Sequence, residues 1–206
     1  VNMTRRNVAT SRMASLLGLD HLVAKSQTAE ILDEATGKTH RGNIMEKAEG
    51  ESLTPIMDQL KKDPNHTVGD PTNFTAGFQR DLVSLQVLDV LCGQSDRHFN
   101  NIFFQRDESG KFTGLTGIDN DASFGLNTDV VSAVHGERHD RRVYDPQSGK
   151  MVLPYMDAAL ADRIAALDGS VVRYALRDLL TDAEISAAVR RLELMKAAIA
   201  DAKQEQ

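Results

Sequence analysis

The sequence predicts an α+β domain with a small first part and a larger, mainly helical second part. Apolar residues recur at helical spacing in the opening, central and C-terminal segments. Two pairs of apolar segments each enclose a turn that contains Gly, Asp and Glu, which is typical of hairpins. The length of 206 residues and the hydrophobic fraction of 41% provide one sizeable core but not two independent domains of usual size.

The first part is predicted to be a helix followed by a hairpin. Apolar residues between Thr4 and Gly18 form a helical stripe, with Thr4 as the N-cap and Gly18 as the stop. The segments 22–32 and 39–50 then flank the turn DEATGK, in which Gly37 supplies a permissive backbone. These segments are expected to pair as two strands.

A connector and a buried helix follow. Residues 50–74 contain three prolines, two glycines and several Asp and Asn, which predicts a connector with at most a short helical turn at 56–61. From about 75 to 91, apolar residues recur at steps of three and four, and Gly93 ends this predicted helix. The stretch IFFQRDESGKFTGLTGI predicts a second hairpin.

The remaining segment combines a polar loop with helices. Thr181 and Glu184 form a capping box before a series of apolar residues at helical spacing. In the polar loop, His135 and His139 are four residues apart, but HGERH is not the HExxH of a metalloprotease, so an ordinary loop is favoured over zinc. Its arginines leave open a contact with an acidic substrate or a phosphate.

Composition excludes several classes of protein. A formal net charge of -6, no Trp and 5% aromatic residues argue against a nucleic-acid partner. No apolar run approaches the roughly 20 residues that span a bilayer, so no transmembrane segment and a cytoplasmic location are expected. The single cysteine, Cys92, excludes an internal disulfide and is predicted to be a core residue.

Two polar clusters meet at the mouth of the second hairpin. The first lies in GQSDRHFNNIFF (93–104), and the second lies in GIDNDASFG (117–125). Phosphoryl transfer needs an acid that positions the attacking group and metal ligands that align the ATP phosphates. Carboxylate and amide oxygens are the side-chain ligands that suit Mg²⁺. Asp96, Asn101 and Asp119 have the order and spacing of the kinase catalytic loop and metal motif.

DRHFNNI followed by IDNDASFG resembles the atypical branch of the protein-kinase-like superfamily. That branch includes phosphatidylinositol 3- and 4-kinases, secretory-pathway kinases and bacterial kinase-like effectors. The specific resemblance covers about 30 residues (93–125), with weaker agreement in NIMEKAEGESL (43–53). It implies a small, incomplete N-lobe at residues 1–49, which includes the hinge strand, and a mainly helical C-lobe at 50–206.

The resemblance also implies roles for residues of both clusters. Asp96 is expected to be the catalytic-loop acid, and Arg97 or His98 is expected to organise the loop or contact a phosphate. Asn101 and Asp119 are expected to bind the Mg²⁺ that accompanies ATP.

Two further expectations come from the same resemblance. Asp121 stands where the family commonly has Gly, so it is either an additional metal ligand or a solvent-facing residue. In the hinge, the backbone of Glu46 and Ala48 is expected to bind the adenine of ATP.

The implied activity is transfer of the ATP γ-phosphate to a protein hydroxyl or an inositol lipid. Alternatives are a pseudokinase that acts as a binding module, and an enzyme that transfers AMP. Only about 42 residues precede the hinge strand, without GxGxxG. Either a glycine-rich N-lobe lies upstream of Val1, or the N-lobe is reduced and an activating partner protein completes the site. An effector of this kind is expected in a host cytosol.

Overall fold

The computed structural model describes residues 3–60, 62, 71–126, 130–132, 140–142 and 151–204. Its helices are α1 (Met3–Leu16), α2 (Leu53–Leu60), α3 (Ala76–Cys92), α4 (Ala158–Ala166), α5 (Gly169–Leu176) and α6 (Asp182–Gln204). Its strands are β1 (Ser26–Asp33), β2 (Lys38–Met45), β3 (Glu51–Ser52), β4 (Ile102–Arg106), β5 (Phe112–Gly117), β6 (Val130–Ser132) and β7 (Asp140–Arg142). One-turn 3-10 helices are Asp20–Leu22, Pro71–Asn73, Phe99–Asn101 and Asn120–Ala122. The predicted α+β class is confirmed.

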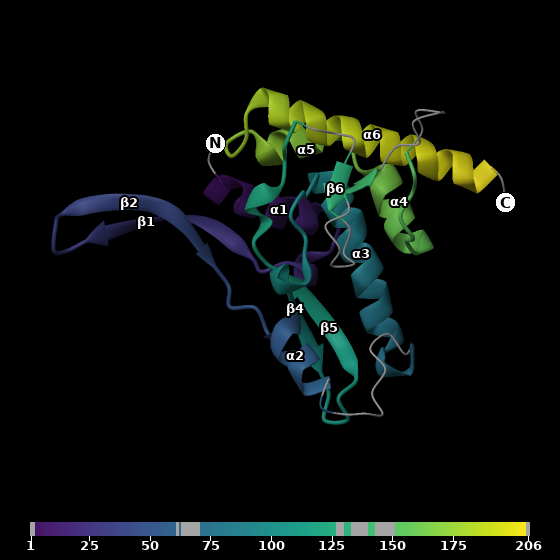
Figure 1. Ribbon diagram of the computed structural model, residues 1–206. Coiled ribbons are helices and arrows are strands. Elements are labelled where there is room, and N and C mark those ends of the chain that lie inside the picture. Colours follow the sequence, from purple (N-terminus) through teal and green to yellow (C-terminus); the bar gives the residue numbers. More distant parts are fainter. Residues whose placement is uncertain are drawn as a thin grey trace.

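Helix α3 is the central element of the body (Figure 1). It begins after Thr75, whose side chain accepts a hydrogen bond from the Phe78 N–H, and it ends at Gly93, which has a φ of 63°. Every residue from Ser84 to Cys92 is buried, because α1, α6 and β5 pack on different sides of the helix. This burial fixes the point at which the first polar cluster leaves the helix.

Helix α1 packs against α3 and α5 and belongs to the same hydrophobic core as the C-terminal helices. It begins at Met3, so the prediction that Thr4 is the N-cap is wrong: Thr4 lies in the first turn. Gly18, with a φ of 66°, follows the last turn as predicted. The boundary between lobes at residues 49 and 50 stays a prediction.

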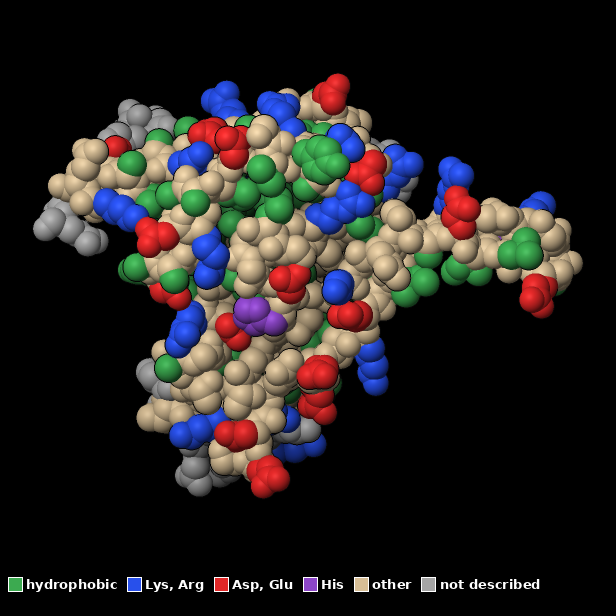
Figure 2. Space-filling model, turned by 180° about the vertical axis from the view of Figure 1, so that it is seen from behind, with side chains coloured by type: hydrophobic (Ala, Val, Ile, Leu, Met, Phe, Trp, Pro, Cys, Tyr) green, Lys and Arg blue, Asp and Glu red, His purple; other side chains and the backbone are tan. Residues whose placement is uncertain are grey.

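Strands β1 and β2 form an antiparallel arm that projects from the body (Figure 1). Gly37 has a φ of 67° in the turn, as predicted. Large apolar side chains are exposed along the arm (Figure 2): Ile31, Leu32, Ile44 and Met45. At its base the Ala24 N–H donates to the Gly117 carbonyl over 3.0 Å, so the arm is joined to the end of β5.

The second hairpin, β4 and β5, carries β3 on its outer edge. Gly50, which has a φ of 95°, precedes β3, and a Cβ atom there would lie only 2.3 Å from the Phe104 carbonyl oxygen. At the far end of the hairpin, aromatic rings from β4, β5, α3 and the segment just before α3 pack together: Phe74, Phe78, Phe104 and Phe112. The two polar clusters lie at the opposite end of the hairpin, before β4 and after β5.

The capping box of the last helix is confirmed. The Thr181 N–H donates to Glu184 Oε2 over 2.9 Å, and the Glu184 N–H donates to Thr181 Oγ1 over 3.3 Å.

No helix in the described part of the chain is long and apolar enough to cross a membrane.

A buried arginine on α6 holds the end of α3. Arg191 has a relative exposure of 0%, and its guanidinium donates to the carbonyls of Leu91 (2.9 Å), Cys92 (3.3 Å) and Gly125 (3.3 Å). Carbonyls at a helix C-terminus carry partial negative charge, so a cation is favourable there. Helix α6 therefore fixes both the end of α3 and the end of the second polar cluster.

We expect Arg191→Met to lower the free energy of unfolding by about 3 kcal/mol, because it leaves buried carbonyl oxygens without their donor. Arg190, its exposed neighbour on α6, is the matched control, and Arg190→Met is expected to change stability by less than about 0.5 kcal/mol. Urea unfolding followed by circular dichroism measures both values. Equal losses in the two variants would contradict the role given to Arg191.

Candidate functional site

A buried ion pair fastens the loop 93–101 to α3. Arg97 and Asp89 are each 1% exposed, and the guanidinium meets the carboxylate through two hydrogen bonds of 3.0 Å. Burial raises the pKa of Asp89, and the positive charge of Arg97 acts in the opposite direction. Neither charge can be removed alone without leaving the other buried and unpaired.

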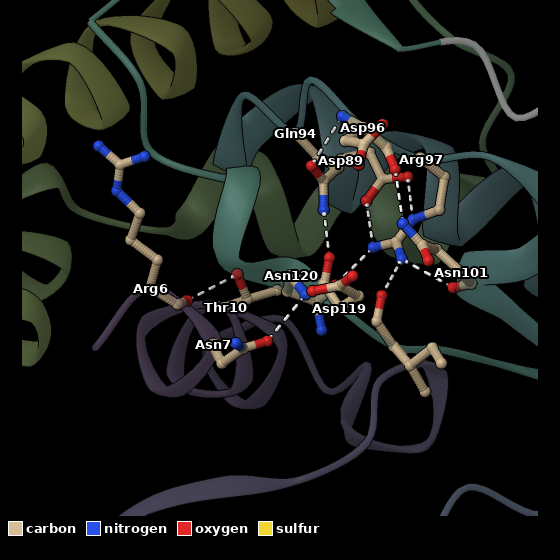
Figure 3. A network of polar contacts seen from close by, with 11 residues as sticks. Arg6, Asn7, Thr10, Asp89, Gln94, Asp96, Arg97, Asn101, Asp119 and Asn120 are labelled. Carbon is tan, nitrogen blue, oxygen red and sulfur yellow. Dashed lines mark hydrogen bonds and ion pairs between the residues drawn. The ribbon is translucent and has the colours of Figure 1, made fainter. Parts of the chain in front are cut away.

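The same guanidinium joins the two polar clusters (Figure 3). Its Nη1 donates to the carbonyls of Asn101 (3.0 Å) and Ile118 (2.7 Å), and its Nη2 donates to Asn120 Oδ1 (2.5 Å). All five N–H groups of Arg97 are thereby used inside the protein. Of the two roles implied for Arg97, the geometry fits loop organisation and leaves no donor for a phosphate.

The first cluster presents Asp96 and holds Asn101 beneath it. The Asp96 side chain is 62% exposed, while its N–H donates to Gln94 Oε1 over 3.0 Å. Asn101 is buried and donates through Nδ2 to the Asp96 carbonyl over 2.8 Å, so its Oδ1 is the atom that could bind a metal. His98 is exposed, with Nε2 4.0 Å from Asp96 Oδ2. The loop therefore offers one carboxylate, one amide oxygen and one imidazole.

The second cluster holds Asp119 in a left-handed conformation. Its φ is 52° and its ψ is 58°, which is uncommon for a residue with a side chain. Its carbonyl accepts a hydrogen bond from Gln94 Nε2 (3.3 Å), and the next N–H, of Asn120, donates to Asn7 Oδ1 (2.8 Å). Such a backbone costs about 1 to 3 kcal/mol and persists only where its surroundings fix it.

Three of the predicted acids lie close enough to affect one another. The pKa of Asp121 is raised, first by burial, then by the charge and hydrogen bonding of Asp119, and then by the charge of Asp96. In the described residues no group of three or more His, Cys, Asp or Glu side chains forms a closed metal site. Mg²⁺ requires no such site, because one or two carboxylates commonly hold it together with phosphates and water.

The predicted hinge leads from the arm to β3. The Glu46 N–H donates to the Lys25 carbonyl over 2.9 Å, which commits this N–H to the base of the arm. Ala48 is half-buried in the connection to β3. Beyond β3, Thr54 Oγ1 donates to Asn100 Oδ1 over 2.8 Å and ties the start of α2 to the first cluster. Adenine binding by Glu46 and Ala48 stays a prediction.

Several residues that shape the site were missed by sequence reasoning: Asn7, Asp89, Gln94, Asn120 and Arg191. For Asp89 a signal existed, because an acid in the most apolar part of a predicted buried helix needs a partner. Nothing in the local sequence marks Asn7, since its partner lies more than a hundred residues away. Its role depends on tertiary structure alone.

The sequence marked other candidate residues outside the two polar clusters. His135, His139 and Arg138 are outside the described residues. Cys92 is buried, as predicted, and burial raises the pKa of its thiol to about 12, so it is a core residue rather than a nucleophile.

A solved structure shares this architecture. The crystal structure of a Helicobacter pylori proinflammatory kinase, CtkA, matches 97% of this chain and 82% of its own chain with a TM-score of 0.54 and 12% sequence identity. The fold is kinase-like. No protein-family model matches the sequence, and no curated protein matches it. The expected combination of a small N-lobe and a helical C-lobe is consistent with this neighbour.

We expect Asp121→Asn to raise the melting temperature at pH 7, without divalent cations, by on the order of 1 °C. The pKa of Asp121 in the folded chain is raised above its ordinary 3.8, so ionisation of this group opposes folding. This penalty is present at neutral pH and disappears below about pH 4, where the two melting temperatures are expected to converge.

Asp107→Asn is the control of opposite sign. Hydrogen bonds from Ser109 hold the pKa of Asp107 below its usual range, so its loss is expected to lower the melting temperature at pH 7. Thermal unfolding from pH 3 to 7 measures both variants. A decrease in both at pH 7 would contradict the raised pKa of Asp121.

Proposed function

We propose that this chain is a phosphotransferase that uses ATP and Mg²⁺. The observation that carries the proposal is the Arg97 guanidinium, which donates to the Asn101 carbonyl in the first loop and, in the second, to the Ile118 carbonyl and Asn120 Oδ1 on either side of Asp119. The kinase-like fold supports the same reaction class. The donor set of carboxylate and amide oxygens fits Mg²⁺.

Each residue of the site has a distinct task in this proposal. Asp96 is exposed, so it can accept a hydrogen bond from an acceptor hydroxyl and take its proton as the oxygen bonds to the γ-phosphorus and ADP leaves. Asn101 Oδ1 and the Asp119 carboxylate would hold the metal, with Asp121 as a further ligand. When bound, Mg²⁺ would offset the negative charge on the phosphate oxygens. Arg97 keeps these groups in register without touching the substrate.

We favour a protein hydroxyl over an inositol lipid as the acceptor, because the sequence has no basic amphipathic helix suited to a membrane surface. Large apolar side chains are exposed on the arm, which favours a further element that covers them. In this proposal that element is either N-lobe residues or an activating partner protein.

A binding module is the second candidate function. The observation that favours it is α1, which has no acidic side chain from Met3 to Leu16. The kinase reaction uses an ion pair between a lysine and a helix glutamate to place the phosphates. A chain without that acid can keep the fold and act by protein contact.

Asp119→Asn is expected to reduce transfer of labelled γ-phosphate by more than about 100-fold, because it replaces a charged metal ligand with a neutral amide and so weakens the hold on the metal used in the transition state. The assay supplies γ-labelled ATP with Mg²⁺, and offers casein and phosphatidylinositol vesicles as acceptors. Asp107→Asn, at the hairpin turn, is the matched control and keeps full activity.

Each alternative gives a different result in this assay. Equal transfer by wild type and Asp119→Asn rejects the metal-ligand role. Label transferred from the α-phosphate indicates AMP transfer. No transfer by the wild type, together with unchanged partner binding in Asp119→Asn, indicates a binding module.

A further inference from the structure

A side chain of α1 reaches the second polar cluster. Asn7 Oδ1 accepts a hydrogen bond from the backbone N–H of Asn120, 2.8 Å away, and Asn120 directly follows Asp119 (Figure 3). The two partners are 113 positions apart in the sequence. Helix α1 thus contacts the backbone of the predicted metal motif.

This contact lies next to a residue with an uncommon backbone conformation. The left-handed conformation of Asp119 is maintained only if the peptides on both sides are held. The preceding peptide is held by Arg97, which donates to the Ile118 carbonyl over 2.7 Å. In the following peptide, the Asp119 carbonyl accepts from Gln94, and the Asn120 N–H donates to Asn7. Asn7 therefore supplies one of the bonds that fix the Asp119 main chain.

Helix α1 is itself fixed by the C-terminal helices. Arg6 donates to Glu184 Oε1 through Nε (3.2 Å) and Nη2 (2.7 Å), with both side chains largely buried. Arg12 contacts both carboxylate oxygens of Asp178, at 2.5 and 3.0 Å. The Arg6–Glu184 pair, made through one carboxylate oxygen, and the bidentate Arg12–Asp178 pair thus hold α1 against the C-terminal segment. The position of Asn7 follows from the C-terminal helices.

We propose that Asn7 is a positioning residue for Asp119, and that α1 is a strut between the C-terminal helices and the metal motif. The proposal rests on the proposed function, because support of the Asp119 backbone affects metal binding only if Asp119 is a metal ligand. Asn7 acts only through the Asn120 peptide. It contributes an amide oxygen from a helix that has no acid between Met3 and Leu16.

Three variants of the full chain test this proposal. Asn7→Leu removes the acceptor at similar volume, and Asn7→Asp retains an acceptor oxygen. Arg5→Gln changes an exposed neighbour on α1 and is the control. The first readout is hydrogen exchange of the Asn120 amide by NMR. The second readout is the affinity for Mn²⁺ with ADP, measured by water-proton relaxation.

Asn7→Leu is expected to speed exchange of the Asn120 amide and to weaken Mn²⁺·ADP binding about 10-fold, as is usual when the support of a metal ligand is lost. Asn7→Asp and Arg5→Gln are expected to retain wild-type protection and affinity. Rescue by aspartate separates positioning from general destabilisation. If Asn7→Leu does not fold, Asn7→Ala gives the same comparison.

Wild-type protection and affinity in Asn7→Leu would overturn the proposal, as would failure of Asn7→Asp to restore them. A different result is expected if the proposed function is wrong: Asp119→Asn then binds Mn²⁺·ADP as tightly as wild type, or neither protein binds it. In that case hydrogen exchange of the Asn120 amide still tests whether Asn7 holds the backbone beside Asp119. Unchanged protection in Asn7→Leu would reject this role, and lost protection would support it.

Discussion

The site depends on the buried ion pair between Arg97 and Asp89. A guanidinium at 1% exposure is favourable only if its charge is paired and its donors are satisfied, and here all five N–H groups find acceptors. One acceptor is a carboxylate within α3, and the others belong to the two polar loops. The cost of burying this charge is therefore offset only when both loops adopt the observed arrangement. The pair acts as a constraint on loop geometry more than as a source of stability.

Other polar contacts extend this constraint to the rest of the chain. Arg191 of α6 holds the end of α3 and the carbonyl of Gly125, and Asn7 of α1 holds the peptide after Asp119. Helices distant in sequence thus converge on a segment of a few residues. Burial, and then the charges of Asp119 and Asp96, raise the pKa of Asp121, so ionisation of this group at neutral pH opposes folding. Such an arrangement is expected where function, rather than stability, decides the residues.

Periodicity and turn chemistry predicted most of the fold, because they are local. Thr75, Gly37 and Gly93 each determine a boundary through the backbone of their own neighbourhood. The hairpin between the two polar loops also predicted that these loops lie together at one end of it, as the bonds of Arg97 to both loops show. The hydrogen bonds that hold these loops could not be predicted from the local sequence, since a hydrogen bond between Asn7 and Asn120 depends on how whole helices pack. The start of α1 was misplaced because Thr4 has the chemistry of an N-cap, although the helix begins one residue earlier.

The most direct test is a crystal structure of the chain grown with Mn²⁺ and a non-hydrolysable ATP analogue. The anomalous signal of manganese locates the ion independently of any assumption about its ligands. We expect a manganese peak about 2.0 to 2.3 Å from both Asn101 Oδ1 and an Asp119 carboxylate oxygen, with the analogue's phosphates completing the coordination. A bound nucleotide whose manganese contacts neither residue would show that Asn101 and Asp119 are not the metal ligands.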